Sequence, residues 1–268
     1  MLKHFNFQIY GQLSKKSPPS LTWSHSYSKV FPHFKSQTYD PGGSFLQFSS
    51  FDVENRPRVK CVSAASGVPI TTQWDKKGYH YATQICQFAL SHWSKAVLST
   101  TNEDPVWLED GNQTQNGARW VGKALPIRVT RDKCAHFDES SKLVFKPVLV
   151  QDYPILSFNL LVRERPKVTL DISSPELGSF NIEYSADTDA PIGRTGHVIT
   201  FGYRGEDETE IPEGTWRLFT RNIVNDLSKG LALTPPVPSQ SKKSVAAWTL
   251  KSISVVRINQ LLYYFVVD

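Results

Sequence analysis

Residues 154–162 read PILSFNLLV, and three similar runs follow along the chain: KVTLDI at 167–172, SFNIEYS at 179–185 and HVITFGY at 197–203. Each run is apolar or alternates apolar with polar residues, and turn-forming residues separate the runs. Such alternation is typical of strands with one buried face. Short strands at this spacing predict a β-sandwich or barrel, so we expect a mainly β fold.

Two segments carry a helical period instead. From about residue 79 to 97, Gln84, Gln87, Ser91 and Lys95 form a polar stripe, and the rest of the surface is mostly apolar (Ile85, Phe88, Ala89, Leu90, Trp93). This pattern predicts a largely buried helix. The segment TWRLFTRNIVNDLSKG (215–230) predicts a second helix over 216–229, with Thr215 as its N-cap and Gly230 as its stop. AAWTLKSISVVRI (246–258) predicts a last strand that closes the sheet.

Composition divides the chain into four parts. Residues 1–21 are expected to be a linker or a disordered start, 22–98 an N-terminal hairpin and helix segment, 99–260 the β-sandwich, and 261–268 an aberrant or truncated tail. The start shows no convincing signal peptide, and no apolar run approaches the roughly 20 residues of a membrane span. Because the last residues are apolar and aromatic, we expect a chain that is incomplete at both ends.

The bulk composition excludes some classes of protein. With 268 residues, 40% of them hydrophobic, the chain can bury one large core or two modest ones. Its three cysteines fit neither a zinc nor a redox spacing, and an odd number leaves at least one free thiol. No P-loop or dinucleotide glycine pattern is present. The net charge of +5 fits an anionic partner or an ordinary soluble surface.

The strongest functional signal lies in the N-terminal third. In RPRVKC (56–61) the residues alternate, which predicts Arg56, Arg58 and Lys60 on one face of an edge strand, exposed to solvent or turned toward an anion. Tyr39, Tyr79 and Tyr81 lie in the same third of the chain. Tyr81 and Gln84 are one helical turn apart and could share a ligand. Separately, Asp110, Asp138 and Glu139 either bind calcium through carboxylate oxygens or line a solvated loop.

Several motifs resemble one family, the D-glucuronyl C5-epimerases of heparan sulfate and heparin biosynthesis. They occur in the family's order: SHSYSKV, RVKC, GVP-x-TTQW, GY-x-Y, Q-x-x-Q-x-x-LSH and SK in the first third, then WRLFTRNIVNDLSKGL. The resemblance covers roughly Trp23 to Arg257. It implies an N-terminal hairpin region, a central β-sandwich and a C-terminal all-helical domain, with the active cleft between the N-terminal segment of one subunit and a helical domain in a homodimer.

The resemblance also implies roles for single residues. Tyr39 matches a tyrosine that is important for activity. Substrate-contacting positions are implied for Phe51, where the family tends to have a tyrosine, and for Arg56, Arg58, Lys60, Gln73, Tyr81, Gln84 and Trp93. Asp110, Asp138 and Glu139 fall near a family calcium site, and no cofactor is implied for catalysis. The implied substrate is heparosan or heparan sulfate, in which D-glucuronic acid becomes L-iduronic acid, and the implied location is the Golgi lumen or membrane.

Two departures from the family pattern bear on activity. Trp93 stands where the family usually has a tyrosine in the LSH-x-SK motif, and an indole cannot exchange a proton as a phenol can. The resemblance also leads us to expect that the family's helical domain is absent from these 268 residues. We therefore expect a C5-epimerase polypeptide that is truncated and does not epimerise by itself. A non-catalytic β-sandwich that binds anionic glycans, or a fragment with no role of its own, are the alternatives.

Overall fold

The computed structural model describes residues 9–14, 17–25, 28–30, 48, 51–99, 105–122, 127–129, 134–137, 140–162, 167–185, 188, 190–202, 215–233, 247–256 and 260–267. Within these residues most elements are strands, and the α-helices are α1 (Ala82–Leu98) and α2 (Ile223–Ala232). The prediction of a mainly β fold is therefore confirmed. Neither helix is long and apolar enough to cross a membrane, in the part of the chain that the structure describes.

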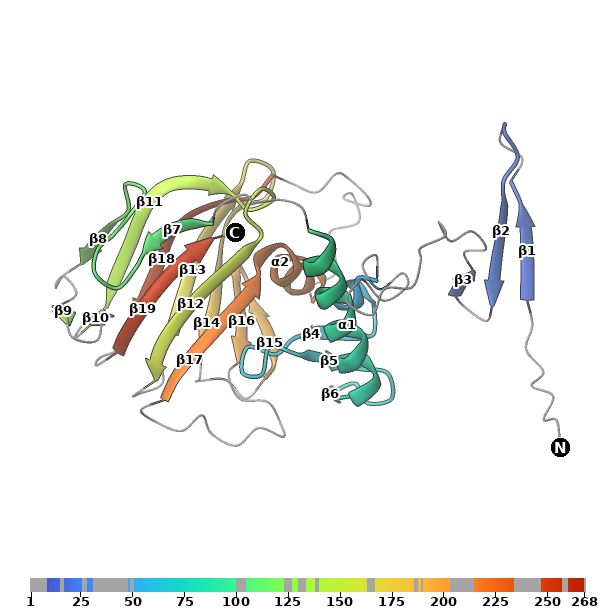
Figure 1. Ribbon diagram of the computed structural model, residues 1–268, viewed down its shortest axis with the longest axis horizontal. Helices are drawn as coiled ribbons and strands as arrows, with labels where there is room; N and C mark the ends of the chain where they lie inside the picture. Colours follow the sequence, from blue (N-terminus) through green and yellow to red (C-terminus); the bar gives the residue numbers. More distant parts are fainter. Residues whose placement is uncertain are drawn as a thin grey trace.

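One sheet of the central body joins strands from distant parts of the chain (Figure 1). Its order is β17 (Thr215–Asn222), β12 (Ile155–Val162), β19 (Gln260–Val267), β10 (Cys134–Phe137) and β9 (Ile127–Val129), and β7 (Val106–Glu109) also pairs with β19. The predicted tail at 261–268 thus falls largely in β19, which lies between β12 and β10. Pairing on both edges makes β19 an integral strand of this sheet.

The second sheet has seven strands. Its order is β15 (Ile192–Thr195), β16 (Val198–Gly202), β14 (Gly178–Ser185), β13 (Lys167–Ser174), β18 (Thr249–Val256), β11 (Ser141–Leu149) and β8 (Arg119–Gly122). The four runs predicted as strands are β12, β13, β14 and β16, and the predicted last strand is β18. That last strand does not close the edge of the sheet, because it lies between β13 and β11.

The core fills the space between the two sheets. Leu156, Phe158 and Leu160 alternate along β12 and are fully buried. Phe158 reaches the other sheet, where its ring centroid is 6.4 Å from that of Tyr184 on β14. Both rings belong to one continuous set of buried apolar side chains. The period-two pattern of the sequence therefore becomes the inner face of a sandwich.

The N-terminal segment forms two small sheets and a helix. β1 (Ile9–Leu13), β2 (Leu21–His25) and β3 (Ser28–Val30) pair in one sheet. β4 (Val59–Val62), β5 (Pro69–Thr71) and β6 (Tyr79–His80) form the other, next to the short 3-10 helix η2 (Val53–Asn55) and α1. Figure 1 shows α1 and β4–β6 beside the end of the sandwich that carries α2. In this way the sandwich supports the segment that carries most of the predicted site residues.

The predicted burial of α1 is wrong. The buried residues of α1 are the polar Gln84, Ser91 and Ser94, whereas Trp93 and Leu98 are 40% and 48% exposed. The reason is that η2 and β5 pack on the polar stripe. Much of the apolar remainder therefore lies at the surface of the described structure.

The predicted second helix begins later than expected. Residues 215–222 form β17, which pairs with β12 along its whole length, and Asn222 caps α2 by accepting a hydrogen bond from the backbone N–H of Asn225. Gly230 is not a stop either, because it lies inside α2, where a Cβ would come within 2.3 Å of Ile199 on β16. Close approach of α2 to the sheet explains the glycine.

Candidate functional site

Arg56 and Arg58, the guanidinium pair, lie at the turn between η2 and β4. Arg56 follows the last residue of η2, and its backbone N–H bonds back to the carbonyl of Val53. Pro57 and Arg58 lie in a turn, and the strand begins only at Val59. The prediction that Arg56 and Arg58 sit on a strand face is therefore wrong. From Val59 on, the predicted alternation is present, with Val59 and Cys61 buried and Lys60 half-buried.

The Arg56 side chain is held from two sides. Its Nη1 donates to Oε1 of Gln87 on α1 at 3.1 Å, and its guanidinium carbon lies 3.9 Å from the ring centroid of Phe51. Burial lowers the pKa of Arg56, and the charge of Arg58 lowers it further. Two like charges that act on each other in this way favour an anion placed between or above them. Since a guanidinium carries five N–H donors, donors remain for a bound carboxylate.

Arg58 is exposed and is anchored through β5 and the residues that follow it. Its Nη1 donates to Oε1 of Gln73 at 2.9 Å, and its carbonyl accepts from the backbone N–H of Thr72 at 2.7 Å. Lys60 is directed elsewhere, because its Nζ donates to the carbonyl of Lys77 at 2.7 Å. The three predicted cations thus have three different anchors, and the two arginines are the ones whose charges act on each other.

An aromatic cluster of Trp74, Tyr79 and Tyr81 begins at the residue after Gln73, the hydrogen-bond partner of Arg58. The Trp74 ring centroid is 5.0 Å from that of Tyr81 and 6.3 Å from that of Tyr79. Trp74 is 69% exposed, which is unusual for so large an apolar side chain. Burial raises the pKa of the Tyr79 phenol, so this group is protonated at neutral pH. An exposed ring that follows the anchor of Arg58 in the chain suits the apolar face of a sugar.

Gln84 and Trp93 leave opposite sides of α1, since successive helix residues turn by about 100°. Gln84 follows Tyr81 by one turn, as predicted, and donates its backbone N–H to the Tyr81 carbonyl. Its side chain is buried, and its Oε1 has no partner among the described residues. Trp93 is 40% exposed and leaves the side of α1 opposite Gln84, so the helix does not bring these two predicted residues together.

The remaining predicted site residues divide into two groups. Tyr39, Asp138 and Glu139 lie outside the described residues. Asp110 is described, and its Oδ1 accepts the backbone N–H groups of Asn112 and Gln113 at 2.9 and 2.8 Å, which fixes its own loop. Among the described residues no three acidic, histidine or cysteine side chains converge as metal ligands. The calcium site therefore stays a prediction.

Sequence reasoning missed two members of this site. Trp74 lies within the motif GVP-x-TTQW, outside the predicted site residues, and the sequence pattern places Gln87 only in the polar stripe of the helix. A large aromatic residue next to Gln73 was the available signal for the first. The second could be identified only from the fold, because the partner of Gln87 is Arg56, far away in sequence.

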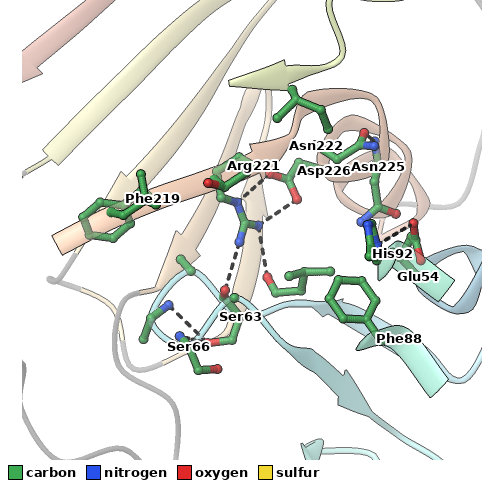
Figure 2. Close-up of a pocket in the computed structure, with 17 residues that line it drawn as sticks. Glu54, Ser63, Ser66, Phe88, His92, Phe219, Arg221, Asn222, Asn225 and Asp226 are labelled. Atoms are coloured by element: carbon green, nitrogen blue, oxygen red, sulfur yellow. Dashed lines mark hydrogen bonds and ion pairs between the residues drawn. The ribbon is translucent and has the colours of Figure 1, made fainter. Parts of the chain in front are cut away.

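A buried ion pair joins this segment to the sandwich (Figure 2). Arg221 on β17 is 2% exposed and donates to both carboxylate oxygens of Asp226, at 2.9 and 2.7 Å. It also donates to the carbonyls of Val62 and Ser63, each at 3.0 Å. The Tyr184 hydroxyl donates to Asp226 at 2.7 Å. Arg221 thereby fixes the end of β4, which is the strand that follows the guanidinium pair.

Comparison with known proteins supports the family resemblance for part of the chain. The chain is similar to a D-glucuronyl C5-epimerase of Caenorhabditis elegans, with 42% identity over 140 residues. These residues are 52% of this chain and 22% of the relative, so the match spans about a fifth of the relative's length. No family model matches the chain.

Proposed function

We propose that this chain is a D-glucuronyl C5-epimerase polypeptide that holds the D-glucuronic acid units of N-sulfated heparosan at Arg56 and Arg58. The observation that carries the proposal is the guanidinium pair itself, two arginines separated by one residue and anchored on Gln87 and Gln73, with an exposed tryptophan next to Gln73 in the chain. The similarity to a C5-epimerase over half of the chain supports the same assignment.

The chemistry of C5 epimerisation explains why two arginines are useful. The reaction removes a proton from the carbon next to a carboxylate and returns a proton to the other face, which forms L-iduronic acid. That carbon is a very weak acid, and the negative charge that develops on the carboxylate must be stabilised by fixed donors. Arg56 and Arg58 supply such donors, and their anchors on Gln87 and Gln73 limit reorganisation when the charge forms.

The aromatic cluster has the complementary role of orienting the sugar. A pyranose ring has an apolar face that packs on an aromatic ring, and Trp74 offers its ring to solvent beside Arg58's partner Gln73. Binding of the carboxylate by the two arginines and of the sugar ring by Trp74 would fix the C5–H bond in space. The same proposal includes the predicted homodimer, the Golgi location and the structural calcium ion.

A second candidate function is a non-catalytic module that binds anionic glycans. The observation that favours it is Trp93, an indole at the position where the family pattern has a phenol, on the side of α1 opposite Gln84. Both functions require that Arg56 and Arg58 bind the carboxylate, and they differ in whether the C5 hydrogen is exchanged.

The test is the affinity of the full 268-residue chain for N-sulfated heparosan, measured by calorimetry at several salt concentrations. Arg58→Ala should weaken binding by about tenfold, since hydrogen bonds to charged groups contribute about 1.5–3 kcal/mol. Trp74→Ala should weaken it as well. Lys251→Ala is the matched control, because Lys251 is an exposed cation on β18 of the seven-stranded sheet. Equal affinity of the Arg58 variant and the wild type would contradict the proposal.

A further inference from the structure

The helix α2 lies between the sandwich and the segment that carries the guanidinium pair (Figure 1). It contacts β15, β16 and β17 of the sandwich and also β4 of the N-terminal segment. Near its start, Arg221 binds the two carbonyls at the end of β4. In its last turn, Lys229 binds the beginning of the same segment, at Arg56. Two cations of the sandwich therefore hold residues 56–63 at both ends.

The two arginines belong to a turn that is closed by one carbonyl oxygen. The backbone N–H of Val59 donates to the carbonyl of Arg56 at 3.0 Å, so residues 56–59 form a β-turn with Pro57 at its second position. Proline is favoured at that position because its ring presets the backbone angle φ. Nζ of Lys229 donates to the same carbonyl oxygen, also at 3.0 Å. The acceptor that closes the turn is thus also the acceptor of the lysine.

The other described hydrogen bonds of this turn stay within the N-terminal segment. The carbonyl of Arg58 accepts from the backbone N–H of Thr72, and the Arg56 side chain donates to Gln87. Among the described residues, Lys229 is the donor that joins residues 56–59 to the sandwich by a hydrogen bond. Because Arg56 and Arg58 start two residues apart on this turn, its conformation decides whether both guanidinium groups can reach the same carboxylate.

A lysine at this place has a cost that stability alone does not explain. Lys229 is half-buried, and this burial lowers the pKa of its ammonium group. Its described partner is the Arg56 carbonyl rather than a carboxylate. Removing a charge from water is unfavourable unless the charge is paired and hydrogen-bonded. In return, a hydrogen bond from a charged donor is stronger than a neutral one, so the carbonyl is held firmly.

We propose that Lys229 is a positioning residue for carboxylate binding, which fixes the turn of residues 56–59 so that Arg56 and Arg58 meet one carboxylate. This inference rests on the proposed function, in which the two arginines bind glucuronic acid. It adds a residue of the sandwich to a site that is otherwise built from the N-terminal segment.

The test compares the affinity of the full 268-residue chain for N-sulfated heparosan and for the same polymer with its carboxyl groups reduced to alcohols, by calorimetry. Lys229→Met should weaken binding of N-sulfated heparosan about fivefold, within the range of couplings in one hydrogen-bond network. Binding of the reduced polymer should not change, which a merely structural role would not explain. Lys251→Met is the control, because it removes the same charge at an exposed position on β18 and should change neither affinity.

Two further variants make the comparison independent of folding defects. Lys229→Met should fold, because the Arg56 carbonyl keeps the N–H of Val59 as a donor, and circular dichroism checks this. Lys229→Gln, which is shorter and uncharged, should show the same selective loss. In an Arg58→Ala background, Lys229→Met should weaken binding by less than about twofold, because the two residues act on the same contact.

The outcomes separate this inference from the proposed function. If the wild type prefers the polymer that keeps its carboxylates, but folded Lys229→Met binds both polymers as the wild type does or loses both equally, the inference is wrong and the proposed function stands. A full additional loss in the Arg58→Ala background would also overturn it. Equal affinity of the wild type for the two polymers would contradict the proposed function, and the inference with it.

Discussion

Replacing Arg221 by methionine should lower the free energy of unfolding by about 3–5 kcal/mol, the usual effect of removing one partner of a buried ion pair. Arg221 is 2% exposed and Asp226 is 1% exposed, so water cannot replace the lost partner. The substitution also leaves the carbonyls of Val62 and Ser63 without their donor. Only the Tyr184 hydroxyl would still donate to the buried carboxylate, among the described contacts.

This loss can be converted into a temperature. For domains of 150–250 residues, 1 kcal/mol shifts the thermal midpoint by roughly 2–4 °C, so Arg221→Met should lower it by about 6–20 °C. Thermal and urea unfolding followed by circular dichroism measure both quantities. Arg119→Met on β8 is the control, because Arg119 is exposed and its replacement should change the stability by less than about 0.5 kcal/mol.

A double variant separates the unpaired charge from the loss of packing. Arg221→Met combined with Asp226→Leu removes both charges and should recover a large part of the loss, because replacing a buried ion pair by apolar groups is often neutral. If Arg221→Met unfolds at the temperature of the wild type, the ion pair does not fix β4 to the sandwich and this reasoning is wrong.

Three further predictions follow from local geometry. Gly230→Ala should cost about 1–3 kcal/mol, because its Cβ would overlap Ile199, whereas Gly193→Ala, where a Cβ meets nothing within 4 Å, should leave unfolding in urea unchanged. Glu54 has a pKa below its unfolded value of 4.5, so its ionised form stabilises the fold above that pH, and this contribution is lost as the pH falls through the lower, folded pKa. Glu54→Gln should therefore make stability depend less on pH in the acid range. An unchanged dependence of stability on acid pH would refute the assignment. The 268-residue chain should not exchange the C5 hydrogen of N-sulfated heparosan in D₂O, because epimerisation needs a proton-transfer group on each face and Trp93 supplies none; deuterium incorporation seen by NMR would show that another residue does.

The strands of the sandwich could be predicted because their signal is local. Alternation along β12 or β13 appears in any short window and directly gives the buried face. The local pattern of segment 215–222 predicts a helix wrongly, since Thr215 followed by an apolar-rich run also fits a helix start. Pairing with β12 along eight residues makes this segment a strand. Because β12 lies some sixty residues earlier in the chain, no local window of sequence contains this information.

The site could be predicted in composition but not in arrangement. Arg58 does bond to Gln73, another residue of the predicted site, yet the two arginines lie at a turn that contains Pro57 rather than on a strand face. The helix shows the same limit. Its apolar content predicted burial, but η2 and β5 meet the side that carries Gln84, and no pattern within the helix reveals which side its neighbours will cover.

The central claim is that Arg56 and Arg58 recognise the carboxylate of glucuronic acid. The most direct measurement compares the affinity of the 268-residue chain for N-sulfated heparosan and for the same polymer with its carboxyl groups reduced to alcohols, which keeps the sulfates. The claim predicts that reduction weakens binding to the wild type by about tenfold and has almost no effect on Arg58→Gln. Equal affinity of the wild type for both polymers would show that sulfate charge alone is bound and would contradict the claim.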